Sequence, residues 1–143
     1  MNNCEICAFR NPRATVTAVI SNGDKFLLAK RTEEPFKGWW DMIGGYMSED
    51  ETPEEALKRE IKEELGVECS AKFMHFFPGY AEWKGSEHPI LSMAFLVDLD
   101  FDKVKVNEEI AELKWFHINE LPEIAFDSNN KIMEYIKKNV KNR

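Results

Sequence analysis

The chain has 143 residues, of which 43% are hydrophobic and 31% are charged. This length and this mixture are typical of one globular domain, and they exclude a disordered or low-complexity protein. The formal net charge of −7 excludes a broad basic surface, so we expect no nucleic-acid partner, and a phosphate-containing ligand would need local cations such as metal ions.

The N-terminal segment MNNCEICAFRNPR lacks the charged and apolar regions of a secretory signal. The longest apolar run, PILSMAFLV, is too short to span a bilayer, so we expect a cytoplasmic protein without a membrane partner. Cys4 and Cys7 form half of a zinc knuckle, but a second half is missing and Cys69 stands alone, so we do not expect a zinc site. We expect residues 1–11 to be an extension and residues 12–143 to be the domain.

The first part of the domain predicts a β-hairpin. From Arg13, the run ATVTAVI is β-branched and apolar, which is typical of a strand. The turn sequence SNGD follows at residues 21–24, and KFLLAKR then reads as a second strand. Residues 32–38 read as a loop, and WWDMIGGY reads as a short extended segment.

The second part of the domain predicts three more strands and a final helix. VECSAKFMHFF and PILSMAFLVDL read as strands, separated by the loop PGYAEWKGSEH, and ELKWFHI reads as a further strand. SNNKIMEYIKKNVK predicts a helix, because its apolar residues follow helical spacing: Ile132, Tyr135, Ile136 and Val140. Since strands dominate and two helices stand far apart in the chain, we expect an α+β fold, with a mixed sheet between helices.

The segment between these two parts, GGYMSEDETPEEALKREIKEELGV, is unusually acidic. Thr52, Pro53 and Glu55 form a capping box with proline at the first helical position, and Gly66 is suited to end a helix. We therefore expect a helix from about residue 53 to residue 65.

The acidic residues of this helix fall beside its apolar stripe. At 100° per residue, Leu57, Ile61 and Leu65 share one face, which must pack on the sheet. Glu60, Glu63 and Glu64 lie directly next to that face, where their mutual repulsion is costly and a divalent cation would relieve it. Oxygen ligands at this density suit Mg²⁺ or Mn²⁺.

Two questions about the helix stay open at this point. The first is the partner of Arg59, which could reach Glu63 or Glu55, or fold back towards Glu51. The second is whether the helix is only a salt-bridged, solvated surface, which is the common reading of a charged helix.

The spacing of the segment answers the second question. Gly45, five residues, Glu51, seven residues and then REIKEELGV at residues 59–67 match the Nudix box, G-x5-E-x7-R-E-U-x-E-E-x-G-U. The resemblance covers about residues 12–140, including the GWWDMIGG approach and the EEIAELKWFHINELP segment. The chain thus resembles the Nudix family, which implies the Nudix fold, a mixed β-sheet in an α/β/α sandwich.

The resemblance also implies roles for particular residues. Glu60, Glu63 and Glu64 would be metal ligands, joined by the carbonyl oxygen of Gly44. Glu51 and Arg59 would orient and neutralise the cluster, next to the box glycine Gly45. A further carboxylate would come from a loop outside the box, where Glu109 matches best and Glu108 and Glu112 are neighbouring alternatives. Either Glu64 or Glu109 would act as the general base.

The implied reaction is Mg²⁺-dependent hydrolysis of a pyrophosphate bond in a nucleoside diphosphate linked to another moiety. The stretch after the box favours ADP-ribose, NADH or a nucleotide sugar. The alternatives are clearance of oxidised nucleoside triphosphates and a sensor that binds a nucleotide without turnover. Family dimers are common, so a homodimer is compatible with the resemblance.

Recognition of the nucleotide must come from residues outside the box. Exposed aromatic side chains could stack on a base, and basic side chains could contact phosphates. The aromatic candidates are Phe36, Trp39, Trp40, Tyr80 and Trp83. The basic candidates are Lys30, Arg31 and Lys84. Ordinary packing or solvation is the competing interpretation for each of them.

Overall fold

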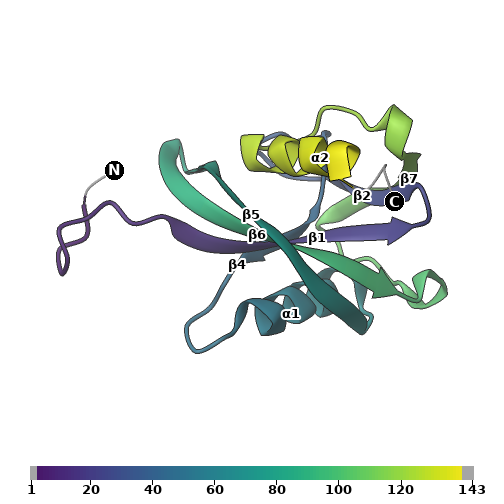
Figure 1. Cartoon of the computed structure of the whole chain (residues 1–143), viewed down its shortest axis with the longest axis horizontal. Helices are drawn as coiled ribbons and strands as arrows, with labels where there is room; N and C mark the ends of the chain where they lie inside the picture. The colour runs from purple at the N-terminus through teal and green to yellow at the C-terminus, as the bar shows by residue number, and fades with distance from the viewer. Residues whose placement is uncertain (1–2, 140–143) are drawn as a thin grey trace.

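Residues 3–139, which the computed structural model describes apart from the Trp83 side chain, form a mixed β-sheet with a helix on each side (Figure 1). Within these residues the sheet has seven strands: β1 (Arg13–Asn22), β2 (Lys25–Arg31), β3 (Trp40–Asp41), β4 (Ile43–Tyr46), β5 (Cys69–Trp83), β6 (Ser86–Leu99) and β7 (Ile110–His117). The helices are α1 (Pro53–Leu65) and α2 (Asp127–Asn139), and the short 3₁₀ helices η1 (Phe101–Lys103) and η2 (Ile118–Glu120) flank β7. The predicted arrangement, a mixed sheet between helices, is confirmed.

The central strand β1 pairs with three others, and this pairing positions the acidic segment. It runs parallel to β6 and forms the predicted hairpin with β2 at Ser21 and Asn22. Its earlier part, Thr15 to Ala18, pairs instead with β4 in antiparallel register. The strand β4, which carries the glycine pair that precedes the box helix, therefore joins the sheet beside β1 and packs on α1.

The two faces of the sheet carry separate hydrophobic clusters. Side chains alternate along β1, so Ala18 packs in the cluster beneath α1 and Val19 in the cluster beneath α2. The predicted apolar stripe of α1, which consists of Leu57, Ile61 and Leu65, is fully buried. The helix α2 buries Ile132, Met133 and Ile136, whereas Val140 lies outside the described residues. No helix within residues 3–139 is long and apolar enough to cross a membrane.

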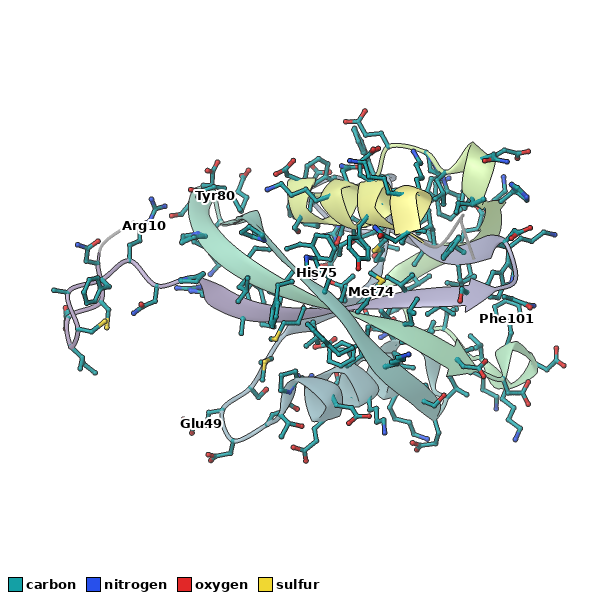
Figure 2. The ribbon with its side chains drawn as sticks, viewed as in Figure 1. Arg10, Glu49, Met74, His75, Tyr80 and Phe101 are labelled. Atoms are coloured by element: carbon teal, nitrogen blue, oxygen red, sulfur yellow. The ribbon has the colours of Figure 1, made fainter. Side chains whose placement is uncertain are left out.

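The predicted loop at residues 78–88 is wrong. The strands β5 and β6 continue through it as one long hairpin, and they turn only at Lys84 and Gly85, both of which have positive φ. Pro78 is tolerated because β5 is the last strand in the sheet order, where a missing N–H group breaks no ladder. Gly79 is required by packing, since a Cβ atom there would lie 2.9 Å from the Cβ of Ser128. Tyr80 is consequently a strand residue, 52% exposed near the tip of the hairpin (Figure 2).

Candidate functional site

The residues that the sequence assigned to the ends of α1 do fix those ends. The Thr52 hydroxyl accepts a hydrogen bond from the Glu55 N–H at 3.2 Å, and the Glu55 carboxylate accepts one from the Thr52 N–H at 3.0 Å. Gly66 adopts the left-handed conformation, with a φ of 65°, and ends the helix. With both ends fixed, the directions of the side chains between them are set.

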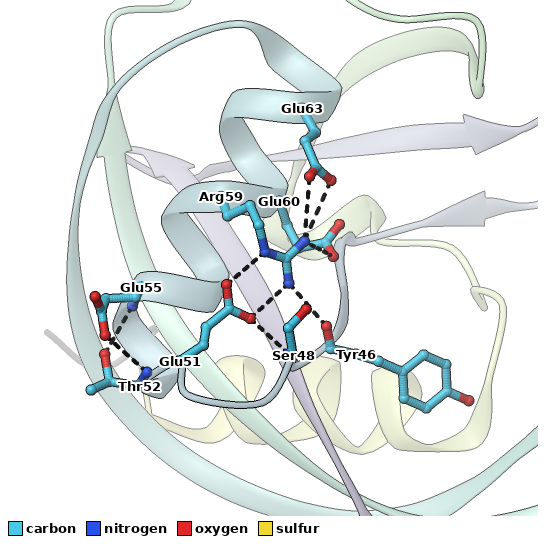
Figure 3. Close-up of polar contacts among 8 residues, drawn as sticks. All are labelled: Tyr46, Ser48, Glu51, Thr52, Glu55, Arg59, Glu60 and Glu63. Atoms are coloured by element: carbon cyan, nitrogen blue, oxygen red, sulfur yellow. Dashed lines mark hydrogen bonds and ion pairs between the residues drawn. The ribbon is translucent and has the colours of Figure 1, made fainter.

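Arg59 is the hub of the acidic segment (Figure 3). Its Nε and Nη2 atoms donate to the two carboxylate oxygens of Glu51 at 2.6 and 2.9 Å. Its Nη1 donates to Glu60 at 3.0 Å and approaches Glu63 at 3.4 Å, while Nη2 also donates to the Tyr46 carbonyl oxygen at 3.1 Å. The open question about its partner is thus answered: Glu51 is confirmed as a partner, and Glu63 is a second, weaker one.

The Arg59–Glu51 pair holds the loop before α1 against the helix. Hydrogen bonds from Arg59, and then one from the Ser48 N–H, lower the pKa of Glu51 to about 2. The same carboxylate raises the pKa of Arg59 above its ordinary value. Both groups are therefore charged at any pH at which the protein would work, and the pair is a fixed element of the site.

The other box carboxylates lie where their charge is costly. Glu63 is exposed, but Glu60 and Glu64 are half-buried at the edge of the core, as the helix geometry predicted for this stripe. Burial raises the pKa of Glu60, against the opposing effect of Arg59. Burial, followed by the charges of Glu60 and Glu109, raises the pKa of Glu64 to about 8. Within the described residues, Glu64 Oε2 is the one buried side-chain oxygen or nitrogen without a hydrogen-bond partner.

These carboxylates fit a hard divalent cation. A buried oxygen without a partner, surrounded by like charges, is the situation that a cation relieves, and carboxylates are the ligands that Mg²⁺ and Mn²⁺ prefer. As the side chains stand, no group of three or more His, Cys, Asp or Glu residues within residues 3–139 could hold a metal ion. Glu60 and Glu63 turn towards Arg59 instead, so metal binding would require them to exchange that partner.

The loop that carries Glu109 is tied to the end of α1. The Asn107 side chain donates to the Glu63 carbonyl oxygen at 3.2 Å, and the Asn107 N–H donates to the Glu64 carbonyl oxygen at 3.1 Å. The Asn107 carboxamide oxygen then accepts from the Glu109 N–H at 3.0 Å. Glu109 and Glu64 line the same hollow of about 150 Å³, the acidic hollow, whereas Glu112 pairs with Lys30 at 3.9 Å. Sequence reasoning missed Asn107, whose role depends on contacts with α1.

The glycine pair of β4 is explained by close contacts on both sides. A Cβ atom at Gly44 would collide with the carbonyl oxygen of Val16, which belongs to the neighbouring strand β1. A Cβ atom at Gly45 would lie 2.6 Å from Glu60 Oε1. Glycine at both positions therefore lets β4 approach β1 and lets Glu60 approach the backbone of β4.

A larger cavity of about 610 Å³ adjoins the acidic hollow. It extends from Gly44 and Gly45 to the start of α2, and the tip of the β5–β6 hairpin forms another part of its wall. The large cavity and the acidic hollow share four wall residues: Arg31, Glu33, Asp41 and Met42. A cavity of this size is suited to a nucleoside-sized ligand.

The candidate recognition residues are distributed unevenly around this cavity. Arg31 and Lys84 line the large cavity, and Lys30 lines the acidic hollow. Phe36 and Trp39 contact each other, and Phe36 also contacts Phe126, which lines the large cavity. Trp40 packs edge-on against Phe116, and the Trp83 side chain lies outside the described part of the chain.

Sequence reasoning missed a buried polar network in the wall of the large cavity. Arg31 Nη1 donates to Asp41 Oδ2 at 2.8 Å, and Asn129 Nδ2 donates to Asp41 Oδ1 at 2.7 Å. Burial raises the pKa of Asp41 to about 6 despite the opposing effect of Arg31. The three residues belong to β2, β3 and α2, so no local spacing connects them.

Comparisons with known proteins agree with these features. A family model of the NUDIX domain matches residues 11–136. ADP-ribose pyrophosphatase from Methanocaldococcus jannaschii is 33% identical over 129 residues, which cover 90% of this chain and 76% of that protein. Nucleoside triphosphatase NudI from Enterobacter sp. (strain 638) is 34% identical over 113 residues, covering 72% of this chain and 80% of the relative. The crystal structure of MutT NUDIX hydrolase from Burkholderia pseudomallei superposes with a TM-score of 0.75 at 27% identity, over 87% of this chain and 97% of the other.

Proposed function

The chain belongs to the Nudix family and is a pyrophosphohydrolase with the predicted Nudix fold, and we propose that its substrate is a nucleoside diphosphate linked to another moiety, with ADP-ribose as the first candidate. The observation that carries this proposal is the shared wall between the acidic hollow and the large cavity. A nucleoside in the large cavity would place an attached diphosphate beside the box carboxylates. The name of the Methanocaldococcus jannaschii relative supports ADP-ribose within this class.

The proposed metal ligands are the carboxylates of Glu60, Glu63, Glu64 and Glu109 and the carbonyl oxygen of Gly44. A divalent cation held there, Mg²⁺ or alternatively Mn²⁺, would neutralise charge on the diphosphate and acidify water. Glu51 holds Arg59 in place, and Arg59 in turn holds Glu60 and Glu63 before they bind metal.

The proposed reaction is attack of water on one phosphorus atom of the diphosphate. Glu64 or Glu109 accepts the proton of the attacking water, and the bond between that phosphorus and the bridging oxygen breaks. With ADP-ribose the products are two phosphate monoesters, AMP and ribose 5-phosphate. Burial and neighbouring carboxylates favour proton uptake by Glu64, because they raise its pKa.

The test is Mg²⁺-dependent turnover of a substrate panel that contains ADP-ribose, NADH, a UDP-sugar and a nucleoside triphosphate. We expect ADP-ribose to give AMP, and we expect Glu63→Gln and Glu64→Gln to lower kcat by at least about 100-fold. Glu54→Gln is the matched control, since Glu54 lies on the same helix but pairs with Lys58 away from the site. No turnover of any panel member, or unchanged rates in both Gln variants, would contradict the proposal.

Hydrolysis of nucleoside triphosphates is the second candidate function. The observation that favours it is the similarity to NudI, which extends over 80% of that relative. The same panel separates the two functions, because a triphosphate gives a nucleotide and pyrophosphate instead of two phosphate monoesters. Higher kcat/KM for the triphosphate than for ADP-ribose would assign the second function.

A further inference from the structure

The end of the large cavity that lies against α2 contains a hydrogen-bond acceptor that the described residues leave unused. Asn129 lines this cavity and is only 7% exposed. Its Nδ2 atom uses both of its hydrogens, one on Asp41 Oδ1 at 2.7 Å and one on the Ala125 carbonyl oxygen at 3.0 Å. No group within residues 3–139 donates to its Oδ1 atom, and this oxygen is not among the fully covered atoms, so it is open to the cavity and available to a ligand.

The orientation of the Asn129 carboxamide is fixed by its neighbours. Asp41 cannot turn away, because Arg31 Nη1 donates to its other oxygen at 2.8 Å and the Met42 N–H donates to Oδ1 at 2.7 Å. Rotating the carboxamide by half a turn would place Oδ1 against two acceptors, the Asp41 carboxylate and the Ala125 carbonyl oxygen. The nitrogen therefore faces the protein, and the oxygen is the atom left for the cavity.

The same cavity also contains a hydroxyl group with a proton to spare. Thr17 Oγ1 and Ser92 Oγ lie 2.9 Å apart, both residues line the cavity, and both are more than nine-tenths buried. Two hydroxyl groups carry two protons, and their mutual hydrogen bond uses one of them. The pair can therefore donate the other proton to a ligand.

The cavity wall supplies an apolar surface close to Asn129. Phe126 lines the cavity, with the Arg31 guanidinium 5.1 Å from its ring centroid on one side and the Phe36 ring 5.0 Å away. A flat, partly polar ligand with both a donor and an acceptor on its edge fits this combination of groups. Adenine has such an edge, with the N6 amino group as donor beside a ring nitrogen as acceptor.

We propose that this end of the cavity is an adenine site, in which Asn129 Oδ1 accepts a hydrogen bond from the N6 amino group and the Thr17–Ser92 pair donates to a ring nitrogen. The inference rests on the proposed function, because the adenosine must be joined to the diphosphate that reaches the box carboxylates. Hypoxanthine carries a carbonyl oxygen in place of the amino group. Two acceptors, this carbonyl oxygen and Asn129 Oδ1, would then face each other with no hydrogen between them. The site therefore discriminates between the two bases through Asn129.

The direct test is calorimetric titration of the wild-type protein with AMP and with IMP. We expect AMP to bind at least about tenfold more tightly, because bound IMP would leave Asn129 Oδ1 without a donor and shielded from water. Equal affinities, or no binding of either nucleotide, would overturn the adenine site. This measurement needs no variant, so it decides the question even if a substitution at Asn129 prevents folding.

A pair of variants then tests the assigned residue. Asn129→Ala should reduce the preference for AMP to less than about threefold, because the discriminating oxygen is gone. Asn130→Ala is the matched control: its carboxamide bonds to Ile124 and Phe126 at the start of α2, so the variant perturbs the helix but keeps the Asn129 oxygen. Retention of the preference in Asn129→Ala, or its loss in Asn130→Ala, would contradict the assignment.

Turnover separates this inference from the proposed function. If ADP-ribose is hydrolysed but AMP and IMP bind equally, the adenine site fails and the function stands. If AMP is preferred but no panel member is hydrolysed, the adenine site stands and the function fails.

Discussion

Two arginine–carboxylate pairs in this protein have similar geometry and opposite electrostatics. Arg59 binds Glu51 at 2.6 Å, and Arg31 binds Asp41 at 2.8 Å. The two carboxylate side chains are equally covered, since each is 13% exposed. Nevertheless the pKa of Glu51 is lowered to about 2, whereas the pKa of Asp41 is raised to about 6.

The difference comes from how much protein surrounds each pair. Glu51 lies in the loop before α1, where the hydrogen bonds from Arg59 and Ser48 outweigh the small cost of covering the carboxylate. Asp41 lies deep in the molecule, beside the large cavity, and burial outweighs everything that Arg31 contributes. The surface pair, Arg59–Glu51, therefore favours the charged forms of both its members. The buried pair, Arg31–Asp41, costs free energy because a charged Asp41 is removed from water, and its main effect is to position neighbouring side chains.

Removing each arginine in turn should give the largest difference between the two pairs. Arg31→Met should lower the free energy of unfolding by about 3 to 4 kcal/mol, because it leaves Asp41 buried without its cation. Arg59→Met should lower it by less than half as much, since water can solvate Glu51 once the arginine is gone. Urea denaturation of both variants at neutral pH measures the difference.

Activity should respond in the opposite order if Arg59 holds the box carboxylates for catalysis. The Arg59→Met protein should stay folded but lose most of its turnover. An Arg31→Met protein as stable as Arg59→Met would show that depth does not distinguish the two pairs.

The pH dependence of the free energy of unfolding should show directly what it costs to bury the charged form of Asp41. Its pKa rises from an ordinary 3.8 to about 6, so between these values the folded chain binds a proton that the unfolded chain has released. The stability contributed by that proton is fully present below pH 3.8 and is lost as the pH rises through 6. Relative to Asp41→Asn, the wild type should lose about 2 kcal/mol between about pH 4.5 and 7.5.

The Asp41→Asn variant serves as the reference because titrating groups that do not interact with Asp41 are common to both proteins and cancel in the difference. Glu64 does interact with Asp41, whose charge helps to raise the pKa of Glu64, so both proteins should also carry Glu64→Gln. Urea denaturation at several pH values measures it. A difference that is constant with pH, or that grows as the pH rises, would mean that Asp41 has an ordinary or lowered pKa in the folded protein.

The surface region was predictable from sequence because its determinants are local. The capping box, the helix-ending Gly66 and the order of acidic and apolar residues all lie within one continuous segment, where helix geometry converts spacing into direction. Arg59 had three candidate partners from sequence, and the structure identified Glu51 because the preceding loop folds back over α1.

The cavity was not predictable because its determinants are distant in sequence. Asp41 and Asn129 are 88 positions apart, and they meet only because α2 packs beside β3. The prediction of a loop between β5 and β6 was wrong for a related reason. Pro78 and Gly79 are typical of loops, but here an edge strand tolerates the proline and close packing on Ser128 requires the glycine. Whether Pro78 and Gly79 belong to a loop or to an edge strand is decided by their neighbours in three dimensions, which the sequence does not show.

The smallest predicted effect tests whether the surface pair depends on the start of its helix. Thr52→Ala removes the hydroxyl that caps the Glu55 N–H, and it should lower the free energy of unfolding by about 1 kcal/mol. Thr32→Ala is the control, because it also removes a threonine hydroxyl with one hydrogen bond, to the Glu109 carbonyl oxygen, but no helix end depends on it.

Because Glu51 precedes Thr52 directly, a frayed helix start should also loosen the Arg59–Glu51 pair, and a double-mutant cycle between Thr52→Ala and Glu51→Gln measures that coupling. A coupling of zero would mean that Arg59 holds Glu51 without help from the helix cap.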